Sequence, residues 1–232
     1  MADSHQHTAV ALFVRHPVPG RVKTRLACDL GSVDACNLYR AMVSDVIAAL
    51  GACRLPIYLF HDGQDAAGLP LEWVTAAEDA IPQAGASLGE RMSAAFEYLF
   101  SIGRQQVILV GSDIPGIDAA LLQSAIAALA EHDVVISPAF DGGYCLVASR
   151  RDRFNNAIFH AIPWSSSRVL DKTLETCTAL GLSYTLLDTR QDIDTLDDVK
   201  AYCRQPSLHA VCTNRWLTAG GFMASACHES RP

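Results

Sequence analysis

Four cationic side chains lie close together near the start of the chain, in the stretch RHPVPGRVKTRLA at residues 15–27. They are Arg15, Arg21, Lys23 and Arg25. Arginine binds phosphate oxygens through paired hydrogen bonds and lysine supplies a point charge, while Pro19 and Gly20 favour an extended, turning backbone. The stretch therefore predicts an anion-binding loop. The alternative is a solvated basic loop that pairs with surface acids.

Asp113 follows the apolar run QQVIL and belongs to the stretch VGSDIPGID at residues 110–118. The apolar run is typical of a buried strand, so this carboxylate is expected where a core strand ends. Magnesium usually takes one or two protein carboxylates, with water and substrate phosphates as the other ligands. Asp113 is therefore a candidate magnesium ligand, and the alternative is an aspartate that only caps a turn.

A second acidic group precedes the helix expected at residues 195–203. Thr195 is a natural N-cap, and the two aspartates just after it fall in the first turn, where the helix dipole favours them. Asp192 and Asp194 lie before the cap, and alternation around Ile193 turns both to one side. Two carboxylates about 4 Å apart repel by about 4 kcal/mol at an effective dielectric near ~20. A bound divalent cation would relieve this repulsion; two solvated loop acids are the alternative.

The stretch SPAFDGGYCLV contains Asp141, Gly142 and Gly143 between two apolar runs. This pattern predicts a hairpin turn, although glycines also let a substrate approach the backbone closely. Asp141 is a weaker candidate for a third metal or substrate contact. Trp164, followed by three serines at 165–167, could line an acceptor pocket or belong to the core.

Strand-like and helix-like segments alternate along the chain and must position these groups. The expected strands are residues 8–14, 55–60, 71–76, 105–110, 133–140, 144–149 and 183–188. The expected helices include one with Leu38, Met42 and Val46 on one face, and others that begin at Ser87, at Asp118, near 166 and at Thr195. The alternation predicts an α/β fold with a mostly parallel sheet, helices on both faces and a small hairpin. Ligands bind beyond the carboxyl ends of the strands in such sheets.

The length and composition restrict the class of protein. The 232 residues suit one α/β domain over 1–204, with a C-terminal tail at 205–232 to which no element is assigned. A net charge of −7 argues against a general binder of nucleic acid or anionic membrane. Neither a long apolar run nor a signal-like start is present, so a cytoplasmic location is expected. The eight cysteines form no C-x-x-C pair, and we expect them to be reduced.

The acidic and basic groups make sense together if the ligand is a nucleoside polyphosphate. Such a ligand carries about four negative charges and would be repelled by Asp113, Asp192 and Asp194 unless a divalent cation, Mg²⁺ or Mn²⁺, lay between them. The basic loop would hold the remaining phosphates. Carboxylates for a metal and cations for a leaving group are what phosphoryl-type transfer requires.

Six stretches of the sequence resemble, in order, an uncharacterised bacterial transferase family of the nucleotide-diphospho-sugar transferase superfamily. They are PVPGRVKTRLA, SLGERM, VGSDIPGI, SPAFDGGYCLV, PWSSSRVLDKTL and DIDTLDD. The resemblance covers roughly residues 9–203 and implies the glycosyltransferase-A fold in a single domain. More distantly, the pattern is similar to 2-phospholactate guanylyltransferases, molybdenum-cofactor guanylyltransferases and CMP-sugar synthetases.

The resemblance also implies roles for individual residues. Asp113 and a late acid, Asp192 or Asp194, would bind Mg²⁺ or Mn²⁺, and Asp113 and Lys23 would be the catalytic residues. The residues expected to bind the nucleotide are Arg15, Pro19, Gly20, Arg21, Lys23, Arg25, Arg91, Ser112, Gly142 and Gly143.

Three functions compete at this stage. The first is nucleotidyl transfer from an NTP to a small phosphorylated or oxyanion acceptor, and the second is glycosyl transfer from an NDP-sugar. Glycosyltransferases of this fold usually carry a D-x-D motif at the central strand, where this chain has only Asp113, so the sequence leans toward the first. The third is a nucleotide sensor without catalysis.

Overall fold

The computed structural model describes residues 7–223, whose strands form a seven-stranded sheet in the order β3-β2-β1-β4-β6-β5-β7. The strands are β1 (Thr8–Val14), β2 (Ile57–His61), β3 (Asp79–Pro82), β4 (Gln106–Gly111), β5 (Val134–Pro138), β6 (Tyr144–Arg150) and β7 (Tyr184–Leu186). Only β6 runs against its neighbours β4 and β5, and the other pairs are parallel. The remaining strands therefore end at one common edge of the sheet. The predicted α/β class and the hairpin between β5 and β6 are confirmed.

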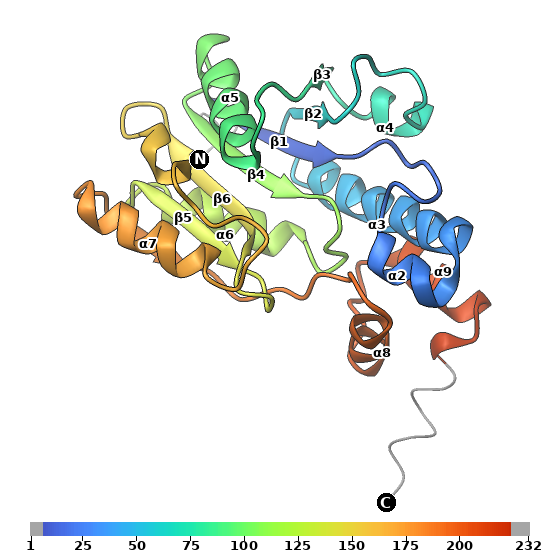
Figure 1. The fold of residues 1–232 in the computed structure, drawn as a ribbon. Helices are drawn as coiled ribbons and strands as arrows, with labels where there is room; N and C mark the ends of the chain where they lie inside the picture. The colour runs from blue at the N-terminus through green and yellow to red at the C-terminus, as the bar shows by residue number, and fades with distance from the viewer. Residues whose placement is uncertain (1–6, 224–232) are drawn as a thin grey trace, which may run out of the picture.

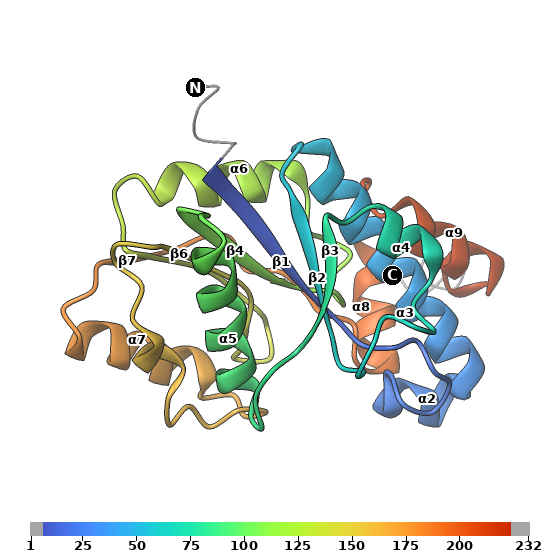
Figure 2. The same ribbon diagram turned by 90° about the horizontal axis from the view of Figure 1, so that it is seen from above.

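Helices cover both faces of the sheet (Figures 1 and 2). They are α2 (Thr24–Leu30), α3 (Ser32–Ala52), α4 (Leu71–Thr75), α5 (Leu88–Ser101), α6 (Ala119–Ala128), η1 (Asn156–Phe159), α7 (Val169–Ala179), α8 (Leu196–Arg204) and α9 (Val211–Ala219). Figure 1 shows α3 and α5 on opposite sides of β1 and β4. Leu38 and Met42 of α3 pack with Leu12 in one core, while Phe96 of α5 packs with Ala11 in the other. Burial of each large apolar side chain contributes about 1.5–3 kcal/mol, so the sheet is fixed from both sides.

Helix starts follow the capping signals in the sequence. The Ser87 side chain accepts a hydrogen bond from the Glu90 N–H, and the Glu90 carboxylate accepts one from the Ser87 N–H. Asp118 accepts from the Leu121 N–H at 2.8 Å. Thr195 and Asp198 form the same reciprocal pair at the start of α8. Such side chains satisfy N–H groups that have no partner inside the helix.

The strand expected at 71–76 is wrong, because Leu71–Thr75 forms the short helix α4. Trp73 is 1% exposed, its ring packs edge-to-face on Tyr39 of α3, and its indole N–H donates to Ser44. One helical turn after Pro70 suffices to bury this single large side chain, and burial outweighs the strand preference of Trp, Val and Thr. The strand next to β2 is instead β3, which the sequence did not indicate.

The segment after residue 204 contributes a helix to the core. The Asp45 carboxylate on α3 is 4% exposed and accepts hydrogen bonds from the N–H groups of Cys212 and Thr213 at 2.8 and 2.7 Å. Leu217 of α9 is fully buried beside α3. The rest of the expected tail, from 224 on, lies outside the described residues.

The seven cysteines within residues 7–223 are free, in line with the expectation from their spacing, and Cys227 lies outside that range. None of the helices described between residues 7 and 223 has the length and apolar character needed to cross a membrane.

Candidate functional site

A cleft of about 730 Å³ opens at the edge of the sheet where the parallel strands end. Residues 15–25 after β1, the end of β4 and residues 192–194 meet there. The predicted residues that line it are Arg15, Lys23, Arg25, Arg91, Ser112, Asp113, Asp141, Gly143, Asp192 and Asp194. Pro19, Gly20, Arg21 and Gly142 do not line it.

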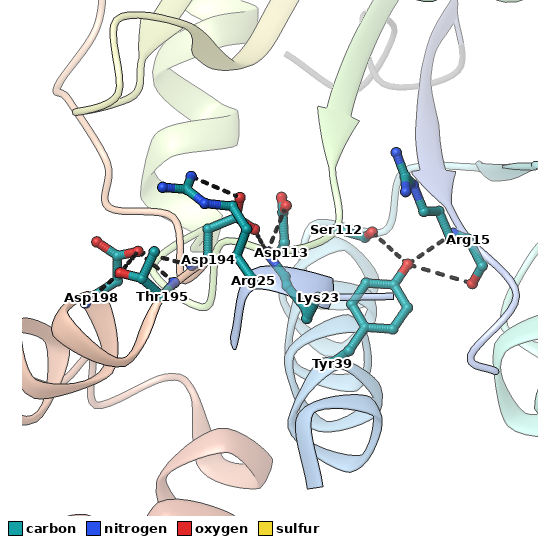
Figure 3. Close-up of polar contacts among 9 residues, drawn as sticks. All are labelled: Arg15, Lys23, Arg25, Tyr39, Ser112, Asp113, Asp194, Thr195 and Asp198. Atoms are coloured by element: carbon teal, nitrogen blue, oxygen red, sulfur yellow. Dashed lines mark hydrogen bonds and ion pairs between the residues drawn. The ribbon is translucent and has the colours of Figure 1, made fainter. Parts of the chain in front are cut away.

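Lys23 lies between two of the predicted metal ligands (Figure 3). Its Nζ donates to Asp113 Oδ2 at 3.0 Å and to Asp194 Oδ1 at 2.7 Å, joining segments 90 and 171 residues away. The Lys23 side chain is 4% exposed, whereas both carboxylates are 40% exposed toward the cleft. The fold therefore gathers opposite charges from three distant segments at one point.

These charges reinforce one another. Burial acts to lower the pKa of Lys23, but Asp113 and Asp194 outweigh it and raise that pKa above its ordinary value. Burial acts to raise the pKa of Asp113, but the Lys23 ammonium outweighs it and lowers that pKa. Both groups are therefore ionised near neutral pH. Arg25 adds a looser contact, since its Nη1 lies 3.8 Å from Asp194 Oδ2 on a side chain that is 73% exposed.

Tyr39, which the sequence analysis did not single out, ties the loop after β1 to the end of β4. Its hydroxyl oxygen accepts from the Arg15 N–H at 2.8 Å and shares a hydrogen bond with the Ser112 hydroxyl at 3.1 Å (Figure 3). Burial raises the pKa of Tyr39 to about 12, so the phenol stays neutral. The contact sets the position of Ser112, and hence of Asp113, relative to the basic loop.

Asp192 and Asp194 both line the cleft while Ile193 between them is fully buried, as the alternation predicts. Ile193 N–H donates to the Asp113 carbonyl at 3.3 Å, which places this segment beside β4. Among residues 7–223, no cation forms an ion pair with Asp192 as Lys23 does with Asp113 and Asp194. Burial, followed by the charges of Asp141 and Asp113, raises the pKa of Asp192 to about 6. Asp113, Asp192 and Asp194 together thus carry more negative charge than Lys23 neutralises.

The chemistry of Asp113 and Asp194 suits a divalent cation such as Mg²⁺. Both supply hard carboxylate oxygens, and both lie within reach of one shared cation, as their contacts with Lys23 show. Within residues 7–223, no three His, Cys, Asp or Glu side chains are arranged to hold a metal ion. Two carboxylates suffice for Mg²⁺ when water and substrate phosphates complete its shell. The role of Asp192 as a metal ligand stays a prediction.

The opposite wall of the cleft is built from α5, the β5–β6 turn and residues 164–166. Arg91 uses its Nε to donate to the Gly85 carbonyl at 3.1 Å. Asp141 accepts from the Gly143 N–H at 2.8 Å, so its first role is to shape the turn. Trp164 packs edge-to-face on Tyr144 and also lines the cleft. Its contact with an acceptor stays a prediction.

Two further residues line the cleft and were not predicted, and only one of them, Asp62, could have been found from the sequence. Asp62 directly follows β2, so the rule that ligands bind at strand ends would have found it. Its carboxylate accepts from the His16 backbone N–H at 2.8 Å and contacts His16 Nδ1 at 3.0 Å. Gln83 follows β3, and it had no signal because that strand was not expected.

The fold, with its seven-stranded mostly parallel sheet, matches that of the nucleotide-diphospho-sugar transferases. A crystal structure from Desulfovibrio desulfuricans G20, provisionally assigned as such a transferase, is 32% identical with a TM-score of 0.84, over 95% of this chain and 98% of that one. Residues 45–166 match the family model described as an uncharacterized protein conserved in bacteria (DUF2064). The chain belongs to this bacterial family.

Two more distant structures share the fold. The inositol-1-phosphate CTP transferase of T. maritima is 13% identical with a TM-score of 0.55, over 91% of this chain and 96% of that one. The 4-diphosphocytidyl-2C-methyl-D-erythritol synthase of Anaerococcus prevotii DSM 20548 is 10% identical with a TM-score of 0.55, over 91% and 99%. Comparison with curated proteins gave no match.

Proposed function

We propose that the protein is a cytoplasmic, Mg²⁺- or Mn²⁺-dependent transferase that acts on a nucleotide-activated donor. Within that class, we propose nucleotidyl transfer from an NTP to a small acceptor that carries a phosphate or another oxyanion. The observation that carries the proposal is the meeting of Lys23, Asp113 and Asp194 in the cleft. The 32%-identical relative and the shared fold support the broader class, a transferase that uses an activated nucleotide.

Each side chain has a distinct task in this proposal. Asp113 and Asp194 hold the divalent cation, which when bound neutralises polyphosphate charge and makes the α-phosphorus more electrophilic. Lys23 in the loop after β1 and Arg25 in the first turn of α2 contact the phosphates, and Arg15 extends the cationic surface along the cleft. An oxyanion of the acceptor bonds to the α-phosphorus, the bond to the bridging oxygen breaks, and pyrophosphate leaves with its charge stabilised by these cations.

Glycosyl transfer from an NDP-sugar is the second candidate, and the provisional assignment of the 32%-identical relative favours it. The same carboxylates and cations would then hold the diphosphate. The sugar would leave the β-phosphate oxygen for an acceptor hydroxyl, and the free product would be an NDP rather than pyrophosphate.

Product analysis separates the two candidates. The purified protein is incubated with Mg²⁺ and each of the four NTPs, or with a panel of NDP-sugars, together with pooled sugar phosphates, phosphonates and neutral sugars as acceptors. Acceptor-dependent release of pyrophosphate supports the proposal, and acceptor-dependent release of NDP supports the alternative. Nucleotide binding without turnover of any donor would point instead to a sensor.

A further inference from the structure

The Lys23 ammonium occupies the place that a metal ion shared by Asp113 and Asp194 would need. Nζ lies 3.0 and 2.7 Å from one oxygen of each carboxylate, and Mg²⁺ binds carboxylate oxygens at about 2.0–2.1 Å. Both cations cannot sit between these oxygens together. We propose that Lys23 is a built-in cation that the divalent metal displaces from Asp113 and Asp194, and that its ammonium then moves onto a phosphate of the arriving nucleotide.

The need for an internal cation follows from the charges. Without Lys23, the two carboxylates would face each other across the space that its ammonium fills, and their repulsion would be uncompensated. The lysine is equally dependent on them, because its side chain is 4% exposed and a buried ammonium without a partner is costly. The ammonium therefore leaves the carboxylates readily only when another anion receives it.

The local geometry allows such an exchange with little change in the backbone. Lys23 stands just before α2 with φ 48° and ψ 46°, a left-handed conformation that anchors it at the helix start. Val22 beside it is buried in the core, so the main chain is held. Four methylene groups lie between this anchor and the ammonium, and rotation about their bonds is enough to change its partner.

One consequence concerns affinity. Metal alone has to compete with Lys23 and binds weakly, whereas metal and nucleotide bind together because the nucleotide supplies the phosphate that takes up the ammonium. This inference rests on the proposed metal dependence, but it concerns the protein's own lysine and is tested without measuring turnover.

The first test uses the native protein and the reactivity of its amines. The chain has three lysines, Lys23, Lys172 and Lys200, and the last two are internal references with side chains 40% and 53% exposed. Acetylation by a water-soluble succinimidyl ester is followed by mass spectrometry during a Mn²⁺ titration. We expect Lys23 to react at least about tenfold more slowly than the references without metal, and several-fold faster with Mn²⁺ bound. A Lys23 rate that stays unchanged once Mn²⁺ saturates the protein, as electron paramagnetic resonance shows, would overturn the proposal.

The second test measures Mn²⁺ affinity by electron paramagnetic resonance without nucleotide. Lys23→Gln is expected to bind Mn²⁺ at least about tenfold more tightly than the native protein, because the competing ammonium is gone. Arg25→Gln is the matched control, since it removes one positive charge two residues away, in the first turn of α2, from an exposed side chain 3.8 Å from Asp194. Equal affinities of Lys23→Gln and the native protein, or an equal gain in Arg25→Gln, would contradict the inference.

The outcomes distinguish this inference from the proposed function. Tighter Mn²⁺ binding by Lys23→Gln without turnover of any nucleotide donor leaves the inference standing and removes the function. Metal-dependent transfer by the native protein, with no gain of Mn²⁺ affinity in Lys23→Gln, would remove the inference and leave the proposed function standing. If Lys23→Gln does not fold, the acetylation rates of the native protein decide the question.

Discussion

The two walls of the cleft are held in place by different forces. On the side of β1 and β4, Lys23, Asp113 and Asp194 are held by charge, and two of the three side chains are 40% exposed. On the side of α5 and the β5–β6 turn, close backbone contacts set the shape. A methyl group on Gly89 would lie 2.3 Å from the Phe159 carbonyl oxygen, and one on Gly142 would lie 2.3 Å from that of Ser167.

The two walls are therefore expected to respond differently to a ligand and to substitution. Ion pairs can exchange partners when a ligand brings new charges, so the first wall suits a metal and phosphates. Contacts without room for even one methyl group cannot adapt, so the second wall keeps a fixed shape. Substitutions on the first wall should therefore change ligand binding, and those on the second should change stability.

The largest effect is expected at Asp113. We expect Asp113→Asn to weaken nucleotide binding in Mg²⁺ by about 100-fold, about 3 kcal/mol, because one of the two carboxylates proposed to hold the metal is lost. Calorimetry with and without EDTA measures this. EDTA should lower the affinity of the native protein toward that of the variant. A native affinity that EDTA does not change would argue against metal-dependent binding.

On the second wall, Gly142→Ala is expected to lower the free energy of unfolding by about 2–4 kcal/mol, because the new methyl group meets the Ser167 backbone. Gly181→Ala is the matched control. It has φ +68° against +88° at Gly142, but no atom lies within 4 Å of its added methyl group. Its loss should be about 1 kcal/mol. Equal losses in urea denaturation would mean that the backbone angle, and not the contact, sets the cost.

Asp192 should make stability depend on pH in the opposite sense to a paired carboxylate. Its pKa rises from 3.8 to about 6 in the folded protein, through burial and then Asp141 and Asp113. The folded state binds the proton more tightly, so this group lowers stability as pH rises from about 4 to about 6. Asp192→Asn should gain about 1 kcal/mol at pH 7.5, a melting temperature about 2–4 °C higher, and little below pH 4.

Thermal melts of metal-free protein across this pH range measure the effect. Asp188→Asn is a suitable control because the Asp188 side chain is 87% exposed. The same gain in the control, or a gain from Asp192→Asn that does not grow with pH, would show that burial of Asp192 is not its source.

The smallest effect is expected from Arg25→Ala, which should change the free energy of unfolding by less than about 0.5 kcal/mol. Its contact with Asp194 is long, at 3.8 Å, and the side chain is 73% exposed, and exposed ion pairs contribute little. Urea denaturation of this variant and of Asp113→Asn, measured in parallel, tests whether Arg25 belongs to the group of ion-paired residues on this wall. A loss above about 1 kcal/mol would indicate that Arg25 is part of the ion-paired group.

Much of this site follows from local patterns in the sequence. A strand-end rule is enough to place Asp113, and the alternation around the buried Ile193 is enough to turn Asp192 and Asp194 toward the cleft. The helix that begins at Thr195 follows from its cap. In each case the signal lies within a few residues of the feature.

Features that depend on distant partners could not be predicted in this way. Lys23 contacts a carboxylate 171 residues away, and nothing near Lys23 distinguishes a lysine that binds phosphate from one that bridges two aspartates. Tyr39 lies on the buried face of a helix, where an aromatic side chain is an ordinary core residue. The helix α4 forms because Trp73 finds space beside α3, which local strand preference does not register.

The hydrogen bonds from α9 to Asp45 bear on where this protein can be cut. A fragment ending at residue 204 would retain the buried Asp45 carboxylate but lose both of its N–H donors. An anion left without partners inside a protein costs several kcal/mol, a large part of the total stability of most domains. The family match ends at residue 166, yet the shortest expression fragment that keeps this anchor must include α9.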